Sequence, residues 1–400
     1  MTQTNVQTAK EVCFAAKEST FGVLPTMKPL IIEADSWEGE QNRTPLEDMD
    51  TSPLLLDEQL RIDGVFEGTA KLKAKLKPYA SQITSTAPVT QPALFDLLEC
   101  AMGGMQVGAG SAITAGTTSQ VTVSSDTGFA IGQVVGISGS SDNQLAVVET
   151  KPGAGVVTFW PNIASAVTSG TLVNSYNAFV TETASSTFSI QHGYPDSSNE
   201  QQELRGCKGK FKLALGAGSL AMLEYDVEAA TGQQGALSLS SSVQTNPLAS
   251  GGHAVKNALL YIQTSATTTR TNYCVEEFAF EFDPAQEWTP CLTGTENKDG
   301  VMRVKGRGVA KLMLKIKADS AEITTWAART ARRVLFAIPN GSGTTKRWIY
   351  VYLPKAVLAR SPKQTKAGGR LLYDLEFHTQ INNSAAANSL AGTSALVGAL

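Results

Sequence analysis

The decapeptide Gly68-Thr-Ala-Lys-Leu-Lys-Ala-Lys-Leu-Lys77 is echoed at Gly308-Val-Ala-Lys-Leu-Met-Leu-Lys-Ile-Lys317, with six of ten positions identical. In the first copy, apolar side chains at every second residue alternate with lysines at 71, 73, 75 and 77. A period of two places one face of a β-strand on a core and the other face in water. The decapeptide therefore predicts two related β-strands, each with one charged face.

A second echo pairs Met222-Leu-Glu-Tyr-Asp-Val227 with Leu372-Tyr-Asp-Leu-Glu-Phe377, in which acidic residues alternate with apolar ones. Between the lysine strand and the acidic strand, each part of the chain has a segment with helical spacing, Pro92–Met102 and Ala318–Phe336. The shared order indicates an internal duplication. The predicted fold class is mainly β, with two sandwich-like or barrel-forming halves that each carry one flanking α-helix.

The two echoes are 240 and 150 residues apart, so the first half holds about 90 additional residues between its landmarks. The stretch 112–176 is rich in Thr, Ser, Val and Gly and predicts a small all-β domain inserted in a surface loop. The domain prediction is a first half at 1–111 and 177–250, the insertion at 112–176 and a second half at 251–400. Gly and Ser clusters at 103–111 and 231–252 are interpreted as loops.

The overall composition favours a folded protein of the cell interior. Charged residues make up 17%, apolar residues 42%, and the net charge is −3, which excludes a strongly basic nucleic-acid binder. The five cysteines are odd in number and have no CxxC spacing, which favours reduced thiols. We expect neither an export signal nor a membrane span, because no cationic start precedes an apolar run and no such run approaches ~18 residues.

Signatures of catalysis and metal binding are missing from the sequence. The three histidines, His192, His253 and His378, have no neighbours at metal-ligand spacing, and no Walker or G-x-S-x-G motif occurs. The glycine-rich segment 340–346 predicts a hairpin turn instead. A carboxylate pair of the glycosidase kind has no local signature and stays open, but we expect a protein that is not an enzyme and has no metal or cofactor.

A strand with four lysines on one face cannot bury that face in a dry core, because unpaired buried charge is too costly. The lysines must meet water or opposite charge. The acidic strands of the same chain can lie beside the lysine strands as cross-strand neighbours, where such pairs set register and partner choice more than stability. Both a wide water-filled tube and an ordinary sheet with one solvated face fit this pattern.

Several short motifs, in this order, resemble the major tail tube proteins of long-tailed bacteriophages (siphophages). Glu18-Ser-Thr-Phe-Gly-Val-Leu-Pro25 is similar to the E-x-x-x-G-x-x-P opening of that family. Asp63-Gly-Val-Phe-Glu-Gly68 leading into a strand, the helix at 92–98, and Leu204-Arg-Gly-Cys-Lys208 before a further strand also match its elements. The resemblance covers most of 18–110, 180–230 and 255–385.

The resemblance implies a structural subunit of the phage tail in the virion, made in the host cytoplasm. Subunits of this family join their inner sheets into a β-barrel around a lumen, and their rings stack into the channel through which DNA is ejected. The implied partners are the chain itself, the tape measure protein and the tail tip or terminator proteins, with DNA only in transit and no membrane. Two halves per chain imply a trimeric, pseudo-hexameric ring, and a hexamer is the alternative.

The family's electronegative lumen suggests acidic residues as the lining, and our candidates are Glu224, Asp226, Glu228, Glu277, Glu281, Asp374 and Glu376. The candidates for contacts between subunits or rings are Lys71, Lys73, Lys75, Lys311, Lys315, Glu33, Asp35, Glu38 and Asp48. Residues 28–60 are the candidate for the long loop that reaches the next ring, ordered only on assembly. Alternative functions are a tail terminator, a capsid decoration protein or, less favoured, a surface carbohydrate-binding β-protein.

Overall fold

The structure is a computed structural model that describes the chain as a series of ranges. The described residues are 11–47, 61–78, 83–86, 91–139, 142–181, 186–194, 201–235, 237, 239, 253–263, 269–270, 274–295, 298–304, 309–317, 326–367, 369–380 and 389–400. Within them the fold is mainly β, with a large antiparallel sheet and a closed six-stranded barrel. No helix in this described part is both long and apolar enough to cross a membrane.

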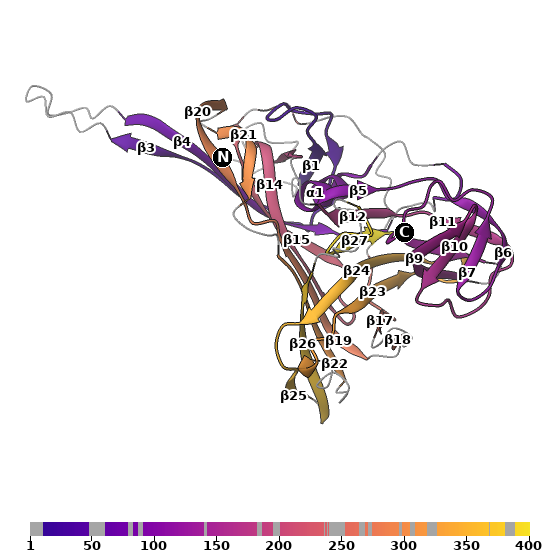
Figure 1. Cartoon of the computed structure of the whole chain (residues 1–400). Helices are drawn as coiled ribbons and strands as arrows, with labels where there is room; N and C mark the ends of the chain where they lie inside the picture. Colours follow the sequence, from indigo (N-terminus) through magenta and orange to yellow (C-terminus); the bar gives the residue numbers. More distant parts are fainter. Residues whose placement is uncertain are drawn as a thin grey trace, which may run out of the picture.

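The central feature is a run of eight antiparallel strands, which we call the long sheet (Figure 1). Its strands, in spatial order, are β3 (Glu38–Glu47), β4 (Arg61–Lys75), β15 (Met222–Ala229), β14 (Gln201–Gly216), β19 (Val275–Asp283), β22 (Val309–Lys317), β26 (Arg370–Thr379) and β25 (Lys363–Ala367). The first four come from the first half of the chain and the last four from the second half. One sheet therefore runs through both halves.

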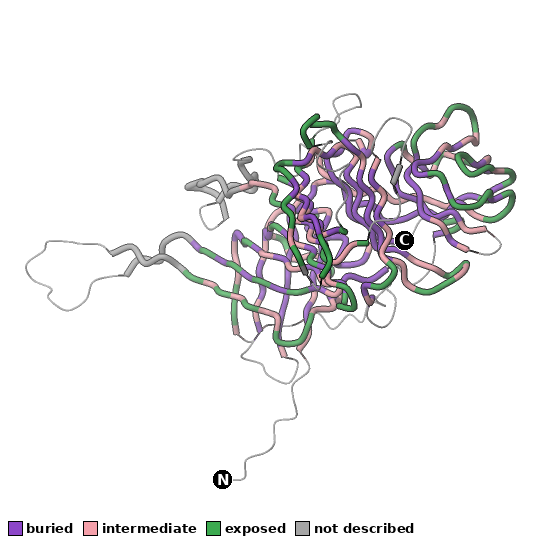
Figure 2. The backbone as a smooth tube through the Cα atoms, turned by 90° about the horizontal axis from the view of Figure 1, so that it is seen from below, coloured by how far each residue is buried: buried purple, intermediate pink, exposed green. Residues whose placement is uncertain are grey.

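Period-two alternation gives the long sheet one apolar face, which forms much of the core. Register aligns Ala74, Leu223, Leu213, Phe280, Leu312 and Phe377 across six strands, and all of these side chains are 0% exposed. Figure 2 shows buried and more exposed residues alternating along these strands. Burial of such a continuous apolar face supplies the main driving force for the sheet.

A second layer packs on this apolar face. It contains α1 (Ala93–Met102) and the strands β1 (Val12–Lys17), β2 (Lys28–Pro29), β5 (Gly103–Gln106), β12 (Tyr176–Val180), β13 (Phe188–Gly193), β16 (Thr231–Gly235), β17 (Leu259–Gln263), β18 (Thr269–Arg270), β23 (Arg332–Asn340), β24 (Arg347–Leu358) and β27 (Leu396–Ala399). The Tyr225 hydroxyl donates to the Leu97 carbonyl of α1 at 3.1 Å, and the Phe278 and Phe336 rings stack at 3.9 Å. The long sheet is thus one layer of a sandwich.

The helix α1 is held at both ends. Near its start the carboxylate of Asp96 accepts from Lys28 at 2.6 Å, and burial raises the pKa of Asp96. Its end is closed by Gly103, which has the left-handed φ of 101° that favours glycine. The helix expected at 92–102 is confirmed.

The stretch between Ser111 and Val173 forms the closed barrel. Its strands are β6 (Ser111–Gly116), β7 (Gln120–Val123), β8 (Val134–Ser138), β9 (Asn143–Gly153), β10 (Val156–Trp160) and β11 (Gly170–Val173). The barrel has its own apolar interior, which includes Val121, Val135, Val157 and Leu172. It lies to one side of the long sheet in Figure 1.

Three expectations from the sequence need correction. The helix predicted over 318–336 is wrong at its end, because residues 332–336 belong to β23. Within the described part of this segment, 326–336, only Trp326 and Ala327 are helical, and 318–325 lie outside the described residues. The glycine-rich loops predicted at 103–111 and 231–252 contain the strands β5 and β16. Backbone pairing needs no side chain, and Gly104 leaves room for the Phe179 ring, which a Cβ would meet at 2.5 Å.

Candidate functional site: the charged face of the long sheet

The face of the long sheet opposite the core carries mainly one sign of charge on each strand. We call it the charged face and define it by the residues that register places there. They are Glu38 and Glu40 on β3; Lys71, Lys73 and Lys75 on β4; Glu224, Asp226 and Glu228 on β15; Lys210 and Lys212 on β14; Glu277, Glu281 and Asp283 on β19; Lys311 and Lys315 on β22; Asp374, Glu376 and His378 on β26; and Lys363 on β25. The prevailing sign alternates at every step from β3 to β25, and among the described side chains Glu67 on β4 and Arg370 on β26 are the charges of the other sign that register also places on this face.

Neighbouring strands on this face are joined by ion pairs. Lys212 and Glu281 are 3.0 Å apart, and Lys315 donates to Glu277 at 3.2 Å, which raises the pKa of Lys315. Two longer contacts of 3.8 Å join Lys73 to Glu224 and Lys210 to Asp226. The exposed fractions of these side chains lie between 24% and 69%, so each ion pair contributes little to stability.

The expected lateral pairing of lysine strands with acidic strands is confirmed. Lys73 lies opposite Glu224 between β4 and β15, and Lys315 lies opposite Asp374 between β22 and β26. By these registers Lys71 and Lys311 face Asp226 and His378, so the acidic strands correspond at an offset of 152 residues rather than 150. A two-residue difference leaves every side chain on the same face.

The two sets of candidate residues share one surface. All seven acidic lumen candidates (Glu224, Asp226, Glu228, Glu277, Glu281, Asp374 and Glu376) lie between lysine strands, which carry Lys71, Lys73, Lys75, Lys311 and Lys315. Glu33, Asp35 and Glu38 are exposed at the edge beyond β4, and Asp48 lies outside the described residues. A lumen lined by the acids would therefore also be lined by the lysines.

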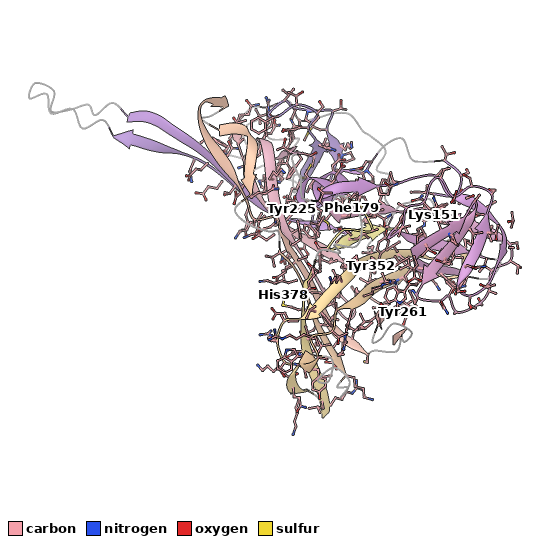
Figure 3. All side chains as sticks on the ribbon, in the orientation of Figure 1. Lys151, Phe179, Tyr225, Tyr261, Tyr352 and His378 are labelled. Carbon is pink, nitrogen blue, oxygen red and sulfur yellow. The ribbon has the colours of Figure 1, made fainter. Side chains whose placement is uncertain are left out.

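The sequence reasoning missed several members of the charged face. Lys210 and Lys212 complete the strand between the two halves, and Lys363 gives the last strand its sign. The signal for Lys210 and Lys212 was present, since Lys208-Gly-Lys-Phe-Lys-Leu213 alternates as the two decapeptides do. Figure 3 labels His378 on the side of the sheet that faces away from Tyr352 and the barrel.

The two outer strands of the long sheet are paired on one side. Among the described residues β3 pairs only with β4, and β25 pairs only with β26. The rest of the β4 edge is covered by the chain just before β3, where the Glu33 amide donates to the Lys73 carbonyl and the Lys75 amide to the Ile31 carbonyl. The sheet therefore has an outermost strand at each end, formed by residues 31–47 and 363–367.

Each half also extends a long hairpin beyond the sandwich. The first is β3–β4, and the second continues β19 and β22 as β20 (Gln286–Thr295) and β21 (Lys298–Val304). Both hairpins leave the same end of the long sheet, opposite the end that carries β25 (Figure 1). Part of the loop expected at 28–60 is thus a paired strand, Glu38–Glu47, while 48–60 lies outside the described residues.

A cleft of about 920 Å³ lies at the base of the two hairpins. Its lining includes Glu38, Lys71, Asp226 and Asp283 of the charged face, together with Lys208. Lys208 is buried and donates to the Gln286 side chain at 3.0 Å, and burial lowers its pKa to about 8. In the described part of the chain, no group of three or more His, Cys, Asp or Glu side chains is placed to hold a metal ion.

No protein-family model matches the chain, and no curated protein matches it significantly.

Proposed function

We propose that the chain is a structural, non-enzymatic subunit of a bacteriophage tail tube, whose copies form stacked rings around a channel for DNA ejection. The observation that carries the proposal is the long sheet. It is one continuous antiparallel sheet with a core face, a hydrated charged face and an outermost strand at each end. A sheet that closes into a barrel with the sheets of other copies needs one solvated face and two edge strands that are free to pair.

The repeated strands support a ring with twice as many units as chains. β4 and β22 are the two decapeptide echoes, and each pairs with an acidic strand, β15 or β26. Each half therefore contributes four strands to the long sheet. A trimer with pseudo-sixfold symmetry is the ring we propose, and a hexamer is the alternative.

The long hairpins support contacts between rings. They extend from the same end of the long sheet, beyond the second layer that covers its apolar face (Figure 1). Hairpins placed in this way would reach a ring stacked on that end. The other partners that we propose come from the family resemblance: the tape measure protein and the tail tip or terminator proteins.

Electron microscopy of the purified full chain tests the proposal. We expect rings or hollow tubes whose number rises with protein concentration or on addition of tail-tip proteins. Analytical ultracentrifugation of the same samples gives the number of chains per ring. A chain that stays monomeric at every concentration, also with tail-tip proteins present, would refute the proposal.

A further inference from the structure

The outermost strands of the long sheet carry opposite charge. The edge at β3 has Glu33, Glu38 and Glu40 exposed within residues 33–40, a stretch with no Lys or Arg. The edge at β25 has Lys363 and Lys366 exposed, and residues 359–370 contain no Asp or Glu. The strand-by-strand alternation therefore ends with an acidic strand on one side and a basic strand on the other.

The seam between the two halves provides a template for what each edge lacks. At this seam β14 pairs with β19, and Glu281 lies opposite Lys212 on one side and Lys311 on the other. Glu38 is the counterpart of Glu281, because it lies opposite Lys71, the equivalent of Lys311 in the echo. Glu38 has a basic strand on one side only. On its other side, where Glu281 has β14, no described strand of the chain pairs with β3.

The basic edge strand, β25, lacks an acidic neighbour on its outer side among the described residues. β25 precedes β26 by a hairpin, as β14 precedes β15, so it is the second-half counterpart of β14. β14 is flanked by the acidic strands β15 and β19, whereas β25 has only the acidic strand β26 beside it. On its other side β25 therefore lacks an acidic strand in the position that β19 has beside β14. The counterpart of β19 in the first half of the chain is β3.

We propose that β25 of one copy pairs with the β3 edge, residues 33–40, of a second copy of this chain. The proposal rests on the proposed function and names the edges that meet. All seven pairings in the long sheet are antiparallel, so the first and last of its eight strands, β3 and β25, run in opposite directions. The new pairing between copies is therefore antiparallel too. The contact then repeats the β14–β19 seam and continues the alternation of charge from one copy to the next.

Charge reversal of the two edges tests this pairing. The variant Lys363→Glu/Lys366→Glu reverses both exposed charges of β25, of which Lys363 lies on the charged face, and the variant Glu33→Lys/Glu38→Lys reverses the acidic edge. Each variant therefore places like charges at the seam. Each should raise the protein concentration needed for ring or tube formation by at least about tenfold. The chain that carries all four substitutions restores opposite charges and should assemble near the wild-type concentration. Lys256→Glu, an exposed reversal away from both edges, is the control.

Assembly is measured by sedimentation and electron microscopy, and circular dichroism checks that each variant folds. Edge variants that assemble as the wild type does, or a fourfold variant that is not rescued relative to the two doubles, would overturn the β25–β3 pairing. The tube function would stand in either case, because wild-type rings still form. Absence of wild-type assembly is a separate result and counts against the proposed function.

Discussion

At the scale of single residues, Glu18 explains why two distant sequence motifs occur together. Its buried carboxylate accepts from the Gly22 amide at 2.9 Å and from the Gly206 amide at 2.7 Å. The hydroxyls of Thr187 and Ser189 donate to it at 2.6 Å each. Both glycines have positive φ, 69° and 60°, which favours glycine at these positions. The E-x-x-x-G and G-C motifs therefore form one buried polar centre.

The Glu18→Gln substitution should be destabilising. An amide group presents NH₂ where one carboxylate oxygen accepted two hydrogen bonds, so a buried backbone N–H or hydroxyl loses its acceptor. We expect the free energy of unfolding, measured by urea denaturation, to fall by about 1–3 kcal/mol. Glu33→Gln at an exposed position is the control and should change it by less than about 0.5 kcal/mol. Equal stability of the two variants would contradict this role of Glu18.

At the scale of elements, the strands of the long sheet separate stability from recognition. One face of β19 carries Phe278, Phe280 and Phe282, each at most 3% exposed. The other face carries Glu277 and Glu281, which pair with lysines in water. Apolar burial on the first face stabilises the strand, while the charges on the second set which strand lies beside it.

This separation predicts unequal costs for two substitutions in neighbouring strands. Phe280→Ala removes a fully buried ring and should lower the free energy of unfolding by about 3–5 kcal/mol. Lys212→Ala removes a half-exposed ion pair with Glu281 and should cost less than about 1 kcal/mol. Urea denaturation of both variants gives the comparison. A cost for Lys212→Ala as large as that for Phe280→Ala would show that the charges also hold the monomer together.

The elements also show how far the sequence could be interpreted. Strict alternation predicted β4, β15, β19 and β22, because a period of two has no helical equivalent. Trp326, Ala327 and Val334 fit helical spacing and predict a helix that includes 332–336, whereas pairing with β24 places this segment in a sheet. The hairpin turn at 340–346 is confirmed by the same pairing. Local spacing carries no information on such long-range partners.

The candidate site was predictable in its parts and not in its arrangement. The sequence indicated strands with lysines and strands with acids, and their lateral pairing is confirmed. Placing both sets on one surface required the order of all eight strands. That order depends on the seam between β14 and β19, where strands more than 60 residues apart pair.

At the scale of the whole molecule, the two halves and the barrel are interlocked. β12 of the first half pairs with β27 at the end of the chain, and β27 pairs with β24. The barrel packs Val147 and Trp160 on the second half in a cluster with Trp348 and Tyr352. The Glu149 carboxylate of the barrel accepts from Arg333 at 2.7 Å. The insertion is therefore part of the core and more than a surface loop.

Removal of the barrel should weaken the rest of the fold. Ser111 and Leu172 lie opposite each other in β6 and β11, so a Gly-Gly linker can replace residues 112–171 without straining the chain. The deletion uncovers Trp348 and Tyr352, and we expect a lower midpoint of thermal unfolding and more binding of a hydrophobic dye. Arg333→Ala, which removes the ion pair with Glu149 and the contact over the Trp160 ring but leaves the barrel in place, should change both little. An unchanged midpoint of thermal unfolding in the deletion variant would show that the barrel does not stabilise the rest of the fold.

The alternation of sign also limits how far the charged face acts. Adjacent strands lie about 4.8 Å apart, so the pattern of charge repeats every ~10 Å across the sheet. Positive and negative rows cancel at distances beyond such a repeat, which is also close to the Debye length of ~8 Å at physiological salt. A polyanion moving past this wall would experience a weak, rapidly averaging potential. The same lysines and carboxylates that select a neighbouring strand at contact distance would thus give a passing molecule little to adhere to.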